Sequence, residues 1–303
     1  MRYSNSLKAT LIRATAGLTF LLLLLSLQAC SLADVRPRDM RKLSLEETDQ
    51  RKGRQLLAEA RAAQGADHLA GHETYTLEVV DNWRGLLGGI ANPWPVNGDE
   101  LHLHYEVGTF DVRAEIREGR KEGDAFGMQS WNTYRQEEGE TIQWKRNRKH
   151  AFVLAAVQYF FEITDRLSRA PIITYAGQHE LYGTTYEGVY VTWEEYEPNR
   201  GNDQYLLYIH PETKLVHGIL YTTREVPNPA PPGWYGNIFF TNWQEVEGYR
   251  YPATMTVQLN KFKAQKRWIH QINIESVEFD RVSNDYIDAN PALTEMGDEK
   301  PSR

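Results

Sequence analysis

The sequence HAFVLAAVQYFFEITDRL, which covers residues 150–167, is apolar around most of its circumference when it is drawn as an α-helix. Phe152, Tyr159, Phe160 and Phe161 supply much of that surface. A helix of this kind must be covered on several sides, because an exposed position would leave a large apolar patch in water. We therefore predict a helix that is wrapped by a curved sheet.

Strands are predicted on both sides of this helix. Residues 74–79, 100–105 and 110–116 alternate between apolar and polar side chains, a period of two that places one face in a core and the other in water. After the helix, the turn Pro211-Glu212-Thr213-Lys214 joins two strands in a hairpin. The strands of this second half are expected at residues 182–193, 203–210, 215–223, 237–243, 251–259 and 271–279. Short turns predict an antiparallel sheet.

The composition agrees with a mainly β protein. The chain has 303 residues, of which 41% are hydrophobic and 25% are charged, an ordinary balance for a globular protein. Aromatic residues make up 12% of the chain, and such rings pack well on half-buried sheets. One helix is expected before the strands, since Ser44-Leu45-Glu46-Glu47 has the form of a capping box and Gly65 provides a stop.

The first thirty residues differ from the rest of the chain. Arg2, Lys8 and Arg13 give a positive start, and residues 18–27 are almost wholly apolar, which is the arrangement of a secretory signal. The run ends in Leu27-Gln28-Ala29-Cys30, which resembles the lipobox of bacterial lipoproteins. That resemblance implies cleavage before Cys30 and attachment of diacylglycerol and an N-linked acyl chain such as palmitate. An ordinary signal peptide with an incidental cysteine is the alternative.

Cys30 is the single cysteine of the sequence, so it forms no intramolecular disulfide and no multi-thiolate metal site. Residues 30–43 are expected to be a lipidated tether, and Ser31 implies the outer membrane by resemblance to sorted lipoproteins. Removing residues 1–29, which carry three positive and no negative charges, changes the formal net charge from -7 to -10. Nucleic acid and anionic headgroups repel such an acidic body, so membrane attachment is expected to come from the acyl chains.

The sequences DQYLLYIHPET, residues 203–213, and FTNWQEVEGYRYP, residues 240–252, resemble recurrent segments of the superfamily of the outer-membrane lipoprotein carriers LolA and LolB. The likeness covers about residues 45–279 and is nearest to the uncharacterised lipoprotein branch. It implies an α+β fold, mainly antiparallel β, in which an incomplete or half β-barrel wraps around helices and leaves an apolar cavity for acyl chains. The expected parts are a signal peptide at 1–29, a tether at 30–43, the LolA-like domain at 44–287 and a disordered tail at 288–303.

The segment WRGLLGGIANPWP, residues 83–95, is predicted to be a glycine-flexible loop between strands. Its apolar side chains suit a lid, or a probe that enters a lipid surface or a partner, similar to the protruding apolar loop of the membrane-anchored lipoprotein acceptor. The alternative is that they fold back and plug the sheet. Ligand contacts are expected from Trp83, Leu86, Leu87 and Ile90 at the mouth, and from Trp94, Phe152, Tyr159, Phe160 and Phe161 in the interior.

Motifs for catalysis are absent from the sequence, which has no Gly-x-Ser-x-Gly elbow, Gly-rich phosphate loop, His-Glu-x-x-His or multi-cysteine pattern. His102 and His104 share a strand face as a metal pair would, but no third ligand is evident, and solvated strand histidines are the simpler interpretation. Three glutamates within residues 194–197 are expected to be a solvated charge run. We therefore predict no enzyme, no metal site and no cofactor other than the lipid on Cys30.

The sequence thus predicts a lipid-anchored, periplasm-facing lipoprotein of the outer membrane that binds a hydrophobic or acyl-chain-bearing ligand without catalysis. A rival hypothesis is a structural lipoprotein whose cavity is filled by its own helix and which holds another envelope protein through the convex sheet or residues 227–233. A hydrolase with a noncontiguous site is a third, and it requires a cleft in which a nucleophile and a base meet. A cavity of several hundred Å³ beneath the second helix would favour ligand binding over a filled interior.

Overall fold

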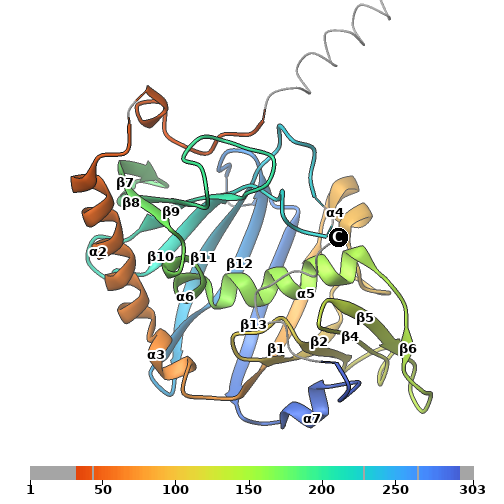
Figure 1. Ribbon diagram of the computed structural model, residues 1–303. Helices are drawn as coiled ribbons and strands as arrows, with labels where there is room; N and C mark the ends of the chain where they lie inside the picture. The colour runs from red at the N-terminus through yellow and green to blue at the C-terminus, as the bar shows by residue number, and fades with distance from the viewer. Residues whose placement is uncertain (1–31, 43, 228, 265, 294–303) are drawn as a thin grey trace, which may run out of the picture.

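The computed structural model describes residues 32–42, 44–227, 229–264 and 266–293 (Figure 1). Within these residues, thirteen strands form one antiparallel sheet. The strands are β1 (Thr74–Trp83), β2 (Glu100–Glu106), β3 (Val112–Ile116), β4 (Ala125–Gln129), β5 (Asn132–Gln136), β6 (Gln143–Trp144), β7 (Ile172–Leu181), β8 (Thr184–Thr192), β9 (Gln204–Ile209), β10 (Val216–Tyr221), β11 (Gly236–Val246), β12 (Tyr249–Leu259) and β13 (His270–Phe279).

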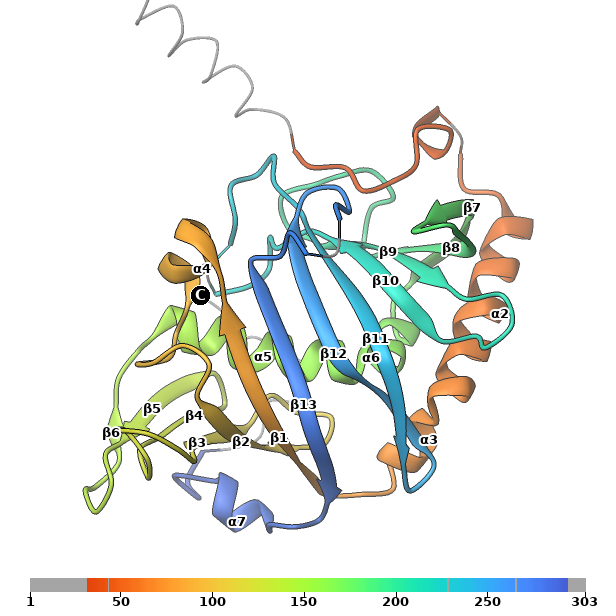
Figure 2. The same cartoon turned by 180° about the vertical axis from the view of Figure 1, so that it is seen from behind.

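Two meanders make up this sheet. Its order is β6-β5-β4-β3-β2-β1-β13-β12-β11-β10-β9-β8-β7, so sequence neighbours pair with each other except where β1 pairs with β13. The strands β6 and β7 lie at opposite edges and are joined by α5 (Arg148–Phe161) and α6 (Ile163–Ser168). These helices cross one face of the sheet, and the opposite face of β11, β12 and β13 is seen in Figure 2. The predicted incomplete barrel around a helix is confirmed, as an open sheet.

The inner side of α5 belongs to the core of the domain. Asn147 caps the helix, because its side-chain oxygen accepts hydrogen bonds from two backbone N–H groups of the first turn. Phe161, at the other end, packs against the rings of Tyr75, Tyr249 and Tyr251. The fully enclosed apolar residues of this helix are Val153, Leu154, Val157 and Phe161. The aromatic side chains of residues 150–167 are therefore divided between the side of α5 that faces the core and a second side of the same helix.

The first long helix, α2 (Glu47–Gln64), packs against β7 and leads into the single turn α3 (Ala66–Leu69). The predicted stop is confirmed: Gly65 has φ 80°, and its N–H bonds to the carbonyls of Arg61 and Ala62. The predicted capping box is wrong, because the helix begins at Glu47 and Ser44 lies outside it. The chain before α2 is held instead by Met40, whose carbonyl accepts a hydrogen bond from the Tyr196 hydroxyl.

Four strands were not expected from the sequence. Three of them, β4, β5 and β6, are short and extend one edge of the sheet, and β7 forms the other edge. β7 is interrupted by a register shift at Gly177, which has φ 82°. Strand segments of this length depend on pairing with distant partners more than on a local pattern.

The segment before α2 lies on the domain surface and is partly buried in it. Ala33 donates its N–H to the carbonyl of Pro232 at 2.8 Å, and Val35 donates to the side chain of Gln204 at 3.3 Å. Val35 and Met40 join an apolar cluster with tyrosines of β8 and β9. Residues 32–42 therefore differ from the free polar spacer that we expected, because their apolar side chains pack. The predicted signal peptide and Cys30 lie outside the described residues.

The start of the expected disordered tail also makes contacts. Gln129 donates its amide to the Asp288 carboxylate and to the carbonyl of Asn290, and accepts the N–H of Asn290 in return. Residues 294–303 are outside the described part of the chain. Among the residues that are described, no helix is long and apolar enough to cross a membrane.

Candidate functional site

A pocket of about 580 Å³ lies along the face of α5 that the core leaves uncovered. Its walls come from α5, α6, β9, β10 and five connecting loops. Eight aromatic side chains line it: Phe110, Trp131, Phe152, Tyr159, Phe160, Trp193, Tyr205 and Tyr221. The polar part of the lining consists of Arg166, Arg169, Glu194, Asn202, Asp203, Thr222, Thr223 and Glu225. The side of α5 that the core leaves uncovered therefore borders a hollow.

The aromatic rings of the pocket touch one another in a continuous series. The Phe110 ring is 4.9 Å from Trp131 and 6.4 Å from Tyr159, measured between centroids. Tyr159 stacks on Tyr205 at 5.6 Å, and Tyr205 meets Trp193 edge to face at 6.0 Å. These distances are typical of favourable aromatic pairs. Rings from three strand connections, a helix and a strand thus form one wall.

The Arg166 guanidinium group forms the floor of the pocket. It lies 4.1 Å from the centroid of the Phe110 ring and 5.7 Å from that of Tyr159. Its charge is balanced by Glu162, whose carboxylate is 2.8 Å away, and both side chains are buried. Arg169, nearer the surface, is paired with Asp165 at 2.5 Å. Both arginines therefore carry a carboxylate partner from outside the pocket lining.

Carboxylates also belong to the pocket lining. The Asp203 carboxylate accepts hydrogen bonds from the Thr222 hydroxyl at 2.8 Å and from the N–H of Arg224 at 2.5 Å. Burial raises the pKa of Asp203 to about 6, and these hydrogen bonds oppose the rise. Glu225, which is half-buried, accepts the N–H of Asp203 at 2.9 Å. A ligand in this pocket would meet both carboxylates and aromatic rings.

Trp131 reaches the pocket from an unusual turn. The two residues that connect β4 to β5, Ser130 and Trp131, have φ values of 47° and 63°. Such a hairpin turn favours Asn-Gly, because both central residues need positive φ, and a bulky side chain there is strained. The turn is held by Asp111, whose carboxylate accepts the N–H of Ser130 at 2.7 Å. The chain accepts this strain at a residue whose indole lines the pocket.

Structural relatives are found by shape and not by sequence. No protein-family model matches the chain. No curated protein matches it either. A putative outer membrane lipoprotein-sorting protein domain from Vibrio parahaemolyticus has a TM-score of 0.51 and 11% identity, covering 79% of this chain and 97% of that chain. A DUF1329 family protein from Desulfovibrio piger has a TM-score of 0.50 and 10% identity over the same shares. The chain shares its fold with these two proteins.

At such low identity the likeness concerns the fold, so the pocket of this domain must be understood from its own residues. Of the nine predicted ligand contacts, Phe152, Tyr159 and Phe160 line the pocket. Phe161 faces the core instead. The remaining lining residues come from loops and strand ends far apart in sequence, and only the aromatic content of the chain hinted at them.

Trp83 and Trp94 lie away from the pocket, and both are buried. Trp83 stacks on His270 with the ring centroids 3.7 Å apart. Trp94 donates its indole N–H to the Asp81 carboxylate at 2.5 Å, and Asp81 also contacts His270 at 2.5 Å. These two tryptophans anchor the segment between β1 and β2 to the rest of the domain.

The segment between them is a short helix, α4 (Gly85–Ala91), rather than the predicted loop. Gly88 makes this possible, because a Cβ atom there would lie 2.6 Å from the carbonyl oxygen of Ile269. Leu86, Leu87 and Ile90 are exposed to 80%, 45% and 59%. They neither plug the sheet nor line the pocket, so α4 presents an apolar surface to the solvent. The helix adjoins α5, since the Lys149 ammonium group donates to the carbonyl of Ile90.

A basic loop lies beside α4. The connection from β12 to β13 carries exposed basic residues at Lys261, Lys263, Lys266 and Arg267. Arg84 joins the two segments, since its N–H bonds to the carbonyl of Ile269 at 2.9 Å and its guanidinium group lies 5.6 Å from the Trp268 ring. The acidic chain therefore has a locally positive and apolar surface, which its net charge did not reveal.

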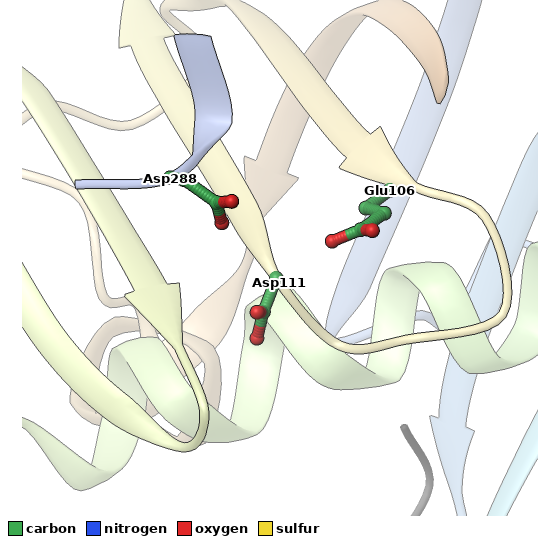
Figure 3. Close-up of side chains that lie close together, drawn as sticks. All are labelled: Glu106, Asp111 and Asp288. Atoms are coloured by element: carbon green, nitrogen blue, oxygen red, sulfur yellow. The ribbon is translucent and has the colours of Figure 1, made fainter. Parts of the chain in front are cut away.

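One group of carboxylates in the described chain has the spacing of a metal site. Atoms of Glu106, Asp111 and Asp288 lie within 4.8 Å of one another (Figure 3). Each accepts a hydrogen bond from a neighbouring N–H donor, namely Asn284, Ser130 and Gln129 respectively. Oxygen ligands of this kind suit calcium or magnesium. These hydrogen bonds join the C-terminal segment to two hairpin turns, and we assign the group that structural role.

The two predicted strand histidines are not solvated. His102 is 3.2 Å from a carboxylate oxygen of Glu78, and His104 is within 2.8 Å of the Thr76 hydroxyl. Both rings are buried, because the short helix α7 (Asn284–Ile287) covers this part of the sheet and Tyr286 meets His104 edge to face. The histidines lie outside the three-carboxylate group.

Proposed function

We propose that this protein is a lipid-anchored, periplasm-facing lipoprotein of the outer membrane that binds a hydrophobic or acyl-chain-bearing molecule in the pocket beside α5, without catalysis. The observation that carries the proposal is the hollow of about 580 Å³ behind aromatic walls. Small-molecule sites usually enclose about 300–1,000 Å³ and are lined mainly by apolar groups with a few polar ones. The rival hypothesis of an interior filled by its own helix requires this space to be closed.

The chemistry of the lining supports binding rather than turnover. The described residues that line the pocket include no serine, cysteine or histidine, the usual nucleophiles and bases of hydrolases. Asp203 has its carboxylate occupied by Thr222 and by two backbone N–H groups. Arg166 is occupied by Glu162 and by the carbonyl of Thr109. These polar groups hold one another and shape the walls.

A lipid on Cys30 would hold the domain close to the bilayer. Ala33 is already bound to Pro232, so only two residues separate Cys30 from the folded body, and the three residue steps between Cys30 and Ala33 reach roughly 10 Å at most. The Arg224 guanidinium group also contacts the carbonyl of Ala33, and the backbone N–H of Arg224 bonds to Asp203 in the pocket wall. The pocket loops would therefore lie near the membrane surface, where an apolar ligand enters from lipid.

The surface of α4 and the basic loop suits contact with that same membrane. Leu86 and Ile90 would enter the interfacial region, while Lys266 and Arg267 would lie at anionic headgroups. Figures 1 and 2 place α4 and the segment after the anchor in the upper half of the molecule. The acyl chains then need not provide all of the attachment.

The proposal is tested by filling the pocket. Ala156 is a half-exposed lining residue of α5, and Ala156→Trp adds a ring to the hollow. Ala62→Trp adds the same ring on the exposed side of α2 and serves as the control. Titration with the apolar dye Nile red should give saturable binding to the wild type and to the control, and at least about tenfold weaker binding to Ala156→Trp. Equal binding by all three proteins would place the dye elsewhere and contradict the proposal.

A further inference from the structure

The pocket wall differs from the wall expected for a site that binds a flexible acyl chain. Eight of its described lining residues are Phe, Tyr or Trp, and none is Leu, Ile or Met. Aliphatic and thioether side chains adapt to a bending chain, whereas aromatic side chains are rigid plates with two rotatable bonds. The shape of the hollow is therefore set by rigid, flat aromatic rings.

Aromatic rings bind a planar ligand more favourably than a flexible chain. An acyl chain against a ring gains only the burial of its surface, about 25 cal/mol per Å². A flat ring in the same place gains that burial and an additional ~0.5–1.5 kcal/mol for each stacked or edge-to-face pair. The contiguous series from Trp131 through Phe110 and Tyr159 to Tyr205 offers several such pairs to one ligand.

Trp131 adds an independent observation. Its φ of 63° is disfavoured for a bulky residue, and glycine is the residue that the turn prefers. Strain of this kind costs about 1–3 kcal/mol and is concentrated at functional sites. Trp131 also contacts Phe110, the first ring of the wall. The strained turn therefore places an indole where a planar ligand would stack.

The charges of the pocket select against anions. The three carboxylates of the lining, Glu194, Asp203 and Glu225, have one cation nearby in Arg224, while Arg166 and Arg169 are balanced by Glu162 and Asp165. A carboxylate or phosphate headgroup would be repelled by the excess of carboxylates. A cation would be attracted there, and aromatic faces also bind cations.

We propose that the ligand of this pocket is a planar, ring-bearing molecule that is neutral or positively charged, and not a fatty acyl chain. This inference rests on the proposed function, because it concerns the occupant of the same pocket. It concerns which hydrophobic molecule fits, so it can fail while hydrophobic binding remains true.

The test compares shape and charge separately. The soluble chain from residue 31 to residue 303, which contains the whole described fold, is titrated by calorimetry with 9-aminoacridine, anthracene-9-carboxylate, dodecylamine and laurate. We expect 9-aminoacridine to bind at least about tenfold more tightly than dodecylamine, and anthracene-9-carboxylate more tightly than laurate. Each cation should also exceed the anion of the same shape. Chains that bind as tightly as rings would overturn the inference and leave the proposed function standing, whereas no binding of any of the four would contradict both.

A variant links the result to the wall. Trp131→Gly removes the indole and relieves the strained φ, so the protein should remain folded with a similar melting temperature. We expect it to bind 9-aminoacridine at least about fivefold more weakly and to lose less affinity for dodecylamine, because the chain loses only buried surface whereas the planar ligand also loses a stacked pair. Trp144→Ala, at the exposed strand β6, removes an indole outside the pocket and should leave both affinities unchanged. Unchanged binding of 9-aminoacridine by Trp131→Gly would contradict stacking on this wall.

Discussion

The Nη2 atom of Arg166 lies 2.8 Å from Oε2 of Glu162, and the two side chains are 1% and 4% exposed. The Tyr75 hydroxyl and the Gln158 amide donate to the other carboxylate oxygen, each at 3.0 Å. The pocket floor is thus a buried ion pair whose carboxylate is fully supported by donors. Removing one member would leave the other charged in a medium of low polarity.

Arg166→Met is therefore expected to lower the free energy of unfolding by about 3–5 kcal/mol, because Glu162 loses its counter-charge. Arg169→Met is the matched control, since Arg169 is also paired with a carboxylate but is 53% exposed, and the expected loss is below about 1 kcal/mol. Urea denaturation at neutral pH measures both. Similar losses for the two variants would mean that burial does not set the strength of the Arg166 pair.

Asp203 should make stability depend on pH in an uncommon direction. Its pKa is about 6 in the folded protein against an ordinary value of 3.8, so the folded state holds the proton more tightly than the unfolded chain does. Its contribution is full below about pH 4 and is lost as the pH rises through about 6. The free energy of unfolding of the wild type should therefore fall by about 3 kcal/mol relative to Asp203→Asn between pH 4 and pH 7. Parallel pH profiles of the two proteins would refute the shifted pKa.

Apolar residues of α4 should affect membrane binding without affecting the fold. Leu86→Ser combined with Ile90→Ser removes exposed side chains, so the melting temperature should not fall. The affinity of the soluble chain for vesicles of phosphatidylglycerol and phosphatidylethanolamine should drop at least about tenfold. Trp144→Ser removes an exposed ring at β6 and is the control. A sedimentation assay that finds equal vesicle binding for all three proteins would rule out α4 as a membrane contact.

Lipidation of Cys30 has its own test in cells. Cys30→Ser should abolish labelling by a palmitate analogue and lower the share of the protein in the membrane fraction, because the proposed lipidation attaches diacylglycerol to that sulfur. Labelling that persists in the variant would show that Cys30 is not the site.

The fold could be predicted where a pattern was local. In residues 150–167 and in the alternating strands, the spacing of the apolar side chains along the chain shows which side is buried. The structure contains both the helix and these strands. β4 and β7 were not predicted, because short or interrupted strands are stabilised mainly by partners distant in sequence. The α4 helix was not predicted, because three glycines in a short segment favour a loop. In the structure, the close approach of Gly88 to the carbonyl of Ile269 explains why a glycine is needed within the helix.

The pocket was predictable only along α5. Phe152, Tyr159 and Phe160 share a helix, so one stripe contains them. Trp131 and Asp203 reach the same hollow from separate hairpins, and nothing local in the sequence joins them. Their convergence depends on the crossing of α5 and α6 from one edge strand to the other.

The hollow beside α5 is proposed above all to hold an apolar molecule. The most direct measurement is mass spectrometry of an organic extract of the soluble chain, purified from the periplasm without detergent, for the wild type and for Ala156→Trp. We expect about one apolar molecule per wild-type chain and none from the pocket-filled variant. A folded wild-type protein whose extract contains no apolar molecule, or a molecule that Ala156→Trp retains, would contradict binding in this hollow.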